Sequence, residues 1–217
     1  GIFLSLVIFP VTRKIIFLFL ILNFELFCIF AHRNQETEKK KSSKDMLSRR
    51  LLRIKALKAL YAHLKTEADS MMVSEKSMMN TIDKAYDLYF QMLSLPAELV
   101  RYAESRQELA RKKMLPSYED LNPNTKFVDN VVIRLLANSD AIGDYLTARK
   151  LTWAAYPELI KGLYNQLASR DYFKSYMSNP DRSFREDCDL VSRFFCDELQ
   201  ECEALDEAVL QDAERIG

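Results

Sequence analysis

The stretch MLSRRLLRIKALKALYAHLK, residues 46–65, has the residue pattern of an amphipathic α-helix. Ser48 is of a type that caps helix N-termini, and it stands just before the first basic residues. Apolar side chains then recur every three or four residues, which places them on one face of a helix. They are Leu47, Leu51, Ile54, Leu57, Tyr61 and Leu64. We expect this face to pack against a hydrophobic core.

The chain that follows keeps the helical spacing. Residues 82–103 continue it through Pro96, where a kink or a break is expected. Residues 115–125 are rich in Pro and Asn, which favour turns, and should form a loop. A helix is expected over residues 127–137, and residues 138–140 supply the next break and cap.

Proline and serine mark the ends of the later helices. A proline at position 157 fits the first turn of a helix over residues 157–167. The chain breaks again at residues 179–180, and Ser183 with Glu186 has capping-box spacing for a helix over residues 183–199. The apolar stripe of this last region continues through Val191, Phe195, Cys202, Leu205 and Val209.

Glycine usage and the absence of strand-like alternation point away from β-structure. Two of the four glycines are the terminal residues, so only Gly143 and Gly162 lie inside a chain of 217 residues. Average usage is about 7%, so tight turns and phosphate-binding glycine loops are scarce here. The sequence predicts an all-α protein, a bundle of about seven helices.

Charge is distributed unevenly along the chain. The net charge is zero, which excludes a globally basic nucleic-acid binder. Residues 46–65 nevertheless carry six basic residues and no acid, whereas residues 181–217 carry twelve acids against four arginines. The basic helix could bind phosphate, could be a solvated face opposite a core stripe, or could dock on the acidic segment. Its basic residues are Arg49, Arg50, Arg53, Lys55, Lys58 and Lys65.

Residues 1–45 form an apolar and then charged leader. Two basic residues precede the apolar stretch 15–30, as in a signal peptide or membrane anchor. This stretch is shorter than the roughly 20 residues that span a bilayer, and it contains Asn23 and Glu25. A membrane anchor and a cleaved signal remain open. We favour a leader outside the working protein, with residues 46–217 as the helical region.

The sequence contains no recognisable catalytic constellation. The two histidines, His32 and His63, lie near no candidate nucleophile or metal set. The four cysteines show no CxxC spacing, so neither a zinc site nor a disulfide framework is indicated. Glu198, Glu201 and Glu203 are expected on a charged helix surface, and Trp153 as a packing anchor between helices. Seven aromatic residues at helical spacing are expected in the core rather than as base-stacking platforms, namely Tyr86, Tyr89, Phe90, Tyr102, Tyr172, Phe173 and Tyr176. We expect no enzyme, no cofactor, no metal and no small-molecule substrate.

Several strings resemble the NusB family of bacterial transcription antitermination factors. SRRLLRIKALKALYAHL is similar to the arginine-rich first helix of that family, of the type Arg-Arg-x-x-Arg-x-x-Ala-Leu-x-x-Leu-Tyr. EDLNPNTKFVDN, residues 119–130, is the most specific of the further matches, beside AYDLYFQMLSL, TWAAYPELIKGLYNQL and SRDYFKSYM. The likeness covers about residues 46–212 and is to an extended form with a long helical insert. The C-terminal half of the family pattern is not found in these residues.

The resemblance implies a cytoplasmic RNA-binding protein. It would act with NusE, a small-subunit ribosomal protein, on boxA-type RNA in ribosomal RNA transcripts, within the transcription elongation complex. Carried over from the family motif, Arg49, Arg50 and Arg53 would contact RNA. Lys55 and Lys58 are added to this RNA-binding set on charge alone.

A rival hypothesis makes the chain a helical interaction or scaffold module. In that case residues 15–30 would anchor it to a membrane, and the basic helix would face anionic lipid. The lysines of residues 39–44 would then lie next to the membrane surface.

Overall fold

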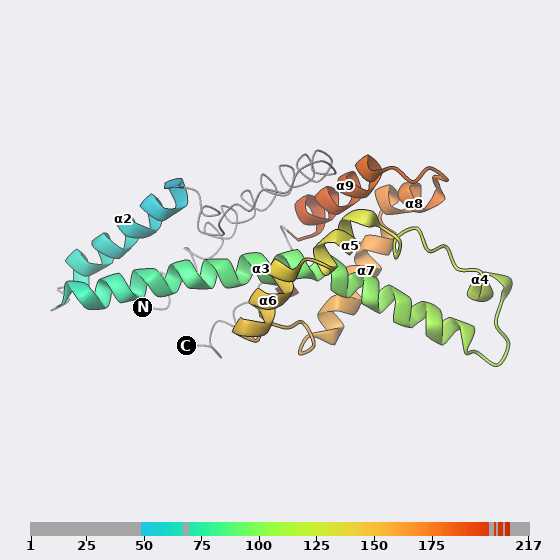
Figure 1. Ribbon diagram of the computed structural model, residues 1–217, viewed down its shortest axis with the longest axis horizontal. Coiled ribbons are helices and arrows are strands. Elements are labelled where there is room, and N and C mark those ends of the chain that lie inside the picture. Colours follow the sequence, from blue (N-terminus) through green and yellow to red (C-terminus); the bar gives the residue numbers. More distant parts are fainter. Residues whose placement is uncertain (1–48, 67–69, 200–201, 203, 206, 209–217) are drawn as a thin grey trace.

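The computed structural model describes residues 49–66, 70–199, 202, 204–205 and 207–208. Every regular element in these residues is a helix, which confirms the all-α prediction (Figure 1). The predictions for residues 1–45 lie outside the described ranges. The elements are α2 (Arg49–Thr66), α3 (Met71–Arg111), α4 (Tyr118–Leu121), α5 (Val131–Ala137), α6 (Asp140–Arg149), α7 (Pro157–Ser169), α8 (Asp171–Ser178), α9 (Phe184–Arg193) and the π-helix η2 (Phe194–Glu198).

Helix α3 is the axis on which the other elements are arranged (Figure 1). It is 41 residues long and runs through Pro96 without a break, and its ribbon bends partway along (Figure 1). The break that was one of the two expectations at Pro96 is therefore absent. Helices α5, α6 and α7 pack against α3. Asp87 of α3 joins it to α6, because Arg149 Nε and Nη2 each donate to this buried carboxylate at 2.7 Å.

The core lies between the middle of α3 and the helices α5 to η2. Trp153 is buried there as the expected anchor, and its indole Nε1 donates to Gln91 O at 3.0 Å. The seven aromatic residues assigned to packing are all buried or half-buried in this core or against it. Val191, Phe195 and Leu205 of the predicted apolar stripe are buried, whereas Val209 lies outside the described residues.

Several predicted boundaries are confirmed. Helix α7 begins at Pro157, α5 ends at Ala137, and Ser183 caps α9 by accepting a hydrogen bond from Glu186 N at 3.2 Å. Two predictions were wrong. Helix α5 begins at Val131 rather than near 127, and residues 115–125 are not all loop, because α4 forms one turn inside them with its own capping box.

The predicted core face of the first helix is also wrong in its C-terminal half. Leu57, Tyr61 and Leu64 are exposed by 67%, 60% and 70%. The side of α2 that meets α3 instead contains Lys55, Ala59 and His63, positions four residues apart. Lys55 and His63 bond to α3, Ile54 and Ala59 are half-buried, and Leu57, Tyr61 and Leu64 face outward.

No helix among the described residues is both long and apolar enough to cross a membrane. Helix α3 has the length, but it is rich in charged side chains.

Candidate nucleic-acid interface

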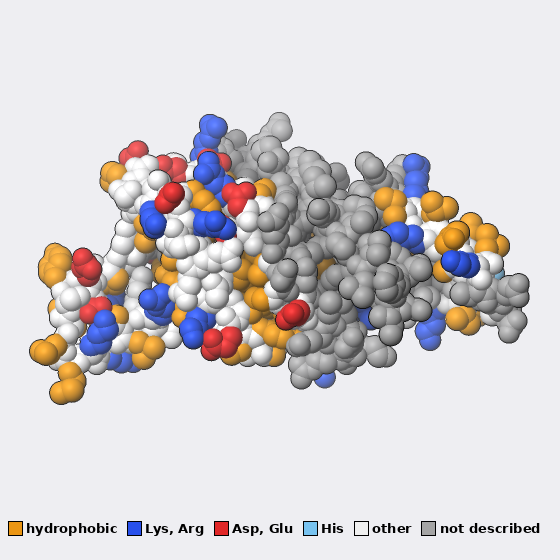
Figure 2. Space-filling view, turned by 180° about the vertical axis from the view of Figure 1, so that it is seen from behind, with side chains coloured by type: hydrophobic (Ala, Val, Ile, Leu, Met, Phe, Trp, Pro, Cys, Tyr) orange, Lys and Arg blue, Asp and Glu red, His pale blue; other side chains and the backbone are white. Residues whose placement is uncertain are grey.

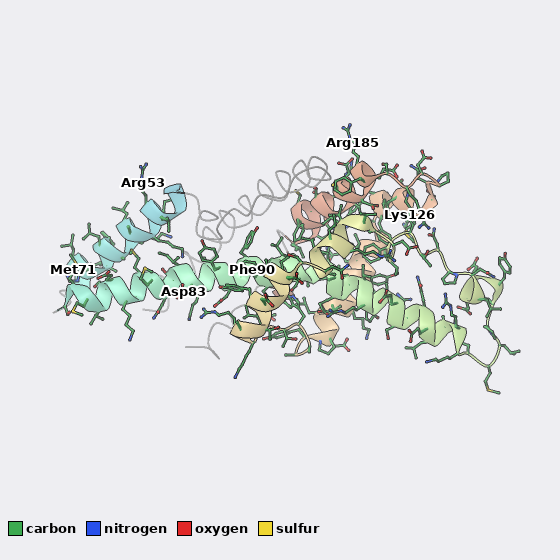
Figure 3. The ribbon with its side chains drawn as sticks, viewed as in Figure 1. Arg53, Met71, Asp83, Phe90, Lys126 and Arg185 are labelled. Atoms are coloured by element: carbon green, nitrogen blue, oxygen red, sulfur yellow. The ribbon has the colours of Figure 1, made fainter. Side chains whose placement is uncertain are left out.

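Helix α2 turns one continuous face away from α3. Arg53, Leu57, Leu60, Tyr61 and Leu64 lie three or four residues apart along it, and all five are exposed. We call these five residues the outer face of α2. Arg53 points away from α3 at its N-terminal end (Figure 3). The outer face therefore has an arginine end and an apolar end.

Of the five predicted RNA-binding residues, the structure describes the side chains of Arg53, Lys55 and Lys58. Arg53 and Lys58 are exposed. Arg49 and Arg50 occupy the first turn of α2, one turn before Arg53, and their side chains lie outside the described part. The guanidinium of Arg53 can present its planar set of donors to a phosphate or to a base edge.

Lys55 is half-buried and bonds to α3. Its Nζ donates to Thr81 O of α3 at 2.7 Å. Burial, and then the charge of Lys58, lower the pKa of Lys55 from its ordinary value of 10.5. Further along the same side of α2, His63 Nδ1 lies 2.9 Å from Ser74 Oγ of α3. Both side chains hold the hairpin that α2 forms with α3, and neither shares the outer face.

The positive charge of α2 is not neutralised within the described residues. Helix α2 contains no acid, and no ion pair there joins it to a carboxylate. The acidic segment begins with α9 and η2, which lie over the middle of α3 rather than against α2 (Figure 1). Two of its acids, Asp187 and Glu198, are buried in the core. Docking of α2 on the acidic segment is thus not seen in these residues.

Glu198 is not on a surface, contrary to the prediction. It is 1% exposed and lies in η2. Four hydrogen bonds satisfy its carboxylate, which is why the charge can be buried. They come from Arg170 Nε (2.7 Å) and Nη2 (3.1 Å), Gln166 Nε2 (2.6 Å) and Tyr172 OH (3.1 Å). The other two carboxylates of this prediction, at 201 and 203, lie outside the described residues.

A buried polar cluster around Lys126 was missed by the sequence analysis. Lys126 is 4% exposed, and its Nζ donates to Asn179 O at 2.8 Å and lies 3.3 Å from Glu186 Oε2. The same Nζ lies 4.4 Å from the ring centroid of Tyr176, whose hydroxyl donates to Asp187 Oδ1 at 2.6 Å. Burial raises the pKa of Tyr176 above its ordinary value of 10. This cluster ties residues 119–130 to α8 and α9, and it is fully paired, so it is a structural element.

The other chemistry-bearing residues do not form a site in the described part. No three His, Cys, Asp or Glu side chains there come together as a metal site. Cys188 is buried, and Cys196 and Cys202 are half-buried. The class of protein that these observations define is an all-helical protein with one exposed, basic and apolar helix face. No model of a protein family, no curated protein and no solved structure matches this chain.

Proposed function

We propose that this chain is an RNA-binding transcription antitermination factor of the NusB type. It acts in the cytoplasm with NusE on boxA-type RNA of ribosomal RNA transcripts, within the elongation complex, and it catalyses no reaction. The observation that carries the proposal is the exposed Arg53 on a helix that contains six basic residues and no acid. The family strings quoted above supply the identity of the RNA and of the partner.

The geometry favours α2 as the RNA contact for an electrostatic reason. Phosphate binding gains free energy by releasing counterions, and this gain needs basic side chains that internal carboxylates do not already hold. Arg53 and Lys58 meet this condition, since both are exposed and no ion pair of theirs is found among the described residues. Lys55 contributes through its charge alone, because its ammonium is bonded to α3.

Binding of a labelled boxA-type RNA, measured by fluorescence anisotropy across a salt series, tests the proposal. Arg53→Ala should weaken binding and lower the salt slope by about 0.7, the value for one lost contact to single-stranded phosphate. Replacing Arg49, Arg50 and Arg53 together should lower it by about three times as much. The matched control is Arg185→Ala, because Arg185 is also an exposed helical arginine but lies on α9 (Figure 3). RNA affinity that does not depend on salt concentration, or that is unchanged in the triple variant, would show that α2 is not the RNA-binding face.

The partner is tested in the same assay. Purified NusE should tighten binding of the boxA-type RNA if the two proteins bind it together, and the RNA should then tighten NusE binding by the same factor. The same RNA with its boxA-type bases scrambled should lose this enhancement. An equal effect of NusE on both RNAs would contradict the proposed partnership.

A further inference from the structure

The apolar end of the outer face needs an explanation that RNA binding does not give. Leu57, Leu60, Tyr61 and Leu64 are exposed by 67%, 46%, 60% and 70%. Aliphatic side chains offer nothing to a phosphate, and scattered exposed leucines would need no explanation. These four are not scattered, because they share one helix face over two turns. Such a grouped patch marks an interaction surface.

The patch continues onto the start of α3. Met71, Met72 and Val73 are exposed in its first turn, which begins four residues or so after the end of α2. Met71 lies at the tip of the hairpin that α2 and α3 form (Figure 3). Methionine adapts its shape to a partner and is common at protein-binding surfaces. We call Leu57, Leu60, Tyr61 and Leu64 the apolar strip, and these α3 residues extend it.

The geometry of the apolar strip suits a helix. Its residues recur at three and four positions, so they form the ridge that packs into the groove of another helix. Recognition of an amphipathic helix uses the same spacing of anchors. Basic side chains flank the strip, namely Lys58 and Lys65, and Lys65 Nζ lies 5.9 Å from the ring centroid of Tyr61. At the right-hand end of Figure 2, which is the α2 end seen from behind, hydrophobic and basic side chains lie next to one another.

The charge of α2 selects among the helices that could dock. A second copy of α2 would place six basic residues opposite six, with no acid on either side. A helix with acidic residues beside its apolar stripe would instead face Lys58 and Lys65 with opposite charge. We propose that the apolar strip of α2 binds an acidic amphipathic helix of a partner protein. This binding does not require RNA, which the arginine end would contact, although Lys58 lies beside both ligands.

Binding of a synthetic helical peptide to the full chain tests the proposal. The probe is a fluorescein-labelled peptide of about three heptads, with leucine at the a and d positions and glutamate at e and g. Leu57→Ser with Leu64→Ser should weaken its binding about tenfold or more, because two central apolar contacts are lost. Leu109→Ser with Leu115→Ser is the control, since these leucines are also exposed, by 66% and 92%, but lie at and just after the C-terminal end of α3. The control variant should bind the peptide as tightly as the unchanged chain does.

Three outcomes would overturn the proposal. Equal binding of a peptide with the same composition but scrambled order would show attraction by charge without a docked helix. Dimers that form without peptide and dissociate in the Leu57→Ser, Leu64→Ser variant would identify a second copy as the occupant. Binding to vesicles of phosphatidylglycerol, lost in that variant while the peptide does not bind, would identify a lipid surface. Loss of RNA binding in the Arg53→Ala variant leaves the expected peptide result unchanged, so the two proposals fail separately.

Discussion

A single buried carboxylate joins α7, α8 and the π-helix. Glu198 accepts from Arg170, which caps the C-terminal end of α7, and from Tyr172 at the start of α8. The hydrogen bond with Glu198 raises the pKa of Arg170, so the guanidinium stays charged. The sequence did not indicate this role, because the pattern around position 198 is locally that of a solvated acidic helix. Its partners lie 26 to 32 residues earlier in the chain.

Arg170→Ala should destabilise the fold clearly, because it leaves a buried carboxylate without its counterion. The loss should be smaller than for a fully buried pair, since the Arg170 side chain is 47% exposed and partly solvated. Urea unfolding measures the difference. Lys161→Ala is the control, because its ion pair with Glu158 lies on the surface of α7, and its effect on the free energy of unfolding should be much smaller. Equal losses in the two variants would show that Glu198 does not depend on Arg170.

Asp129 gives the fold a dependence on acidic pH. Thr125 Oγ1 donates to its carboxylate at 2.6 Å, and together with Arg182 and Arg134 it holds the pKa of Asp129 below its ordinary value of 3.8. The unfolded chain therefore binds this proton more readily than the native one. The stabilisation is complete above the ordinary pKa, and it is lost as the pH falls through the lower native value.

Asp129→Asn should therefore cost about 1 kcal/mol at neutral pH and much less in acid. Urea unfolding at several values between about pH 3 and pH 7 measures how the difference narrows. Asp189→Asn changes an exposed aspartate of α9 and should show no such narrowing. A difference for Asp129 that stays constant with pH would mean that hydrogen bonding by the neutral side chain, rather than charge, stabilises this loop.

At the scale of the elements, helix caps differ in what their side chains do. Asn130 Oδ1 accepts from Ile133 N at 3.0 Å at the start of α5, and its Nδ2 donates to Tyr176 OH at 3.3 Å. Ser139 stands at the same position of α6 but makes no side-chain cap bond. Asn130→Ala should thus cost about 1–2 kcal/mol, and Ser139→Ala only a few tenths. Thermal or urea unfolding of the two variants compares them. Similar losses of stability in the two variants would mean that the side-chain cap bond of Asn130 does not contribute.

The elements themselves were largely predictable, because helix period and breakers are local signals. Pro157 and Ser183 marked helix starts correctly, since both act on the residues next to them. The start of α5 was misplaced for a nonlocal reason. Lys126 and Asn130 form hydrogen bonds with residues in or next to α8 and α9. These bonds hold residues 126–130 out of α5, although the sequence pattern there is compatible with a helix.

The exposed side of α2 was also predicted wrongly for a nonlocal reason. Periodicity identified one apolar side, yet it could not say which neighbour that side would meet. Lys55 and His63 bond to α3, and Leu57, Leu60 and Leu64 are exposed to solvent. The residues of the predicted RNA site all lie on α2, and Arg53 and Lys58 are exposed there, but their contact with RNA stays a prediction.

At the scale of the whole molecule, α3 passes, within the residues that the structure describes, from a hairpin without buried side chains to a packed bundle (Figure 1). Among the described residues before Ala85, none is buried. The bundle, in contrast, contains fully buried side chains such as Leu95, Leu163 and Phe195. Burial of apolar surface is the main source of stability, so the hairpin and the bundle should differ in how readily they open.

Amide hydrogen exchange should therefore divide α3 into two parts. Amides of residues 52–65 and 71–84 should open at a cost on the order of 1–2 kcal/mol, and those of residues 90–103 only with global unfolding at roughly 5 kcal/mol or more. An 18-residue helix alone is marginal in water, so contacts with α3 supply most of what protection α2 has. Adding the acidic peptide should slow exchange over residues 57–64 if the apolar strip is its site, and the Leu57→Ser, Leu64→Ser variant should abolish this change. Uniform protection along α3 without any ligand would show that the hairpin opens only with the bundle.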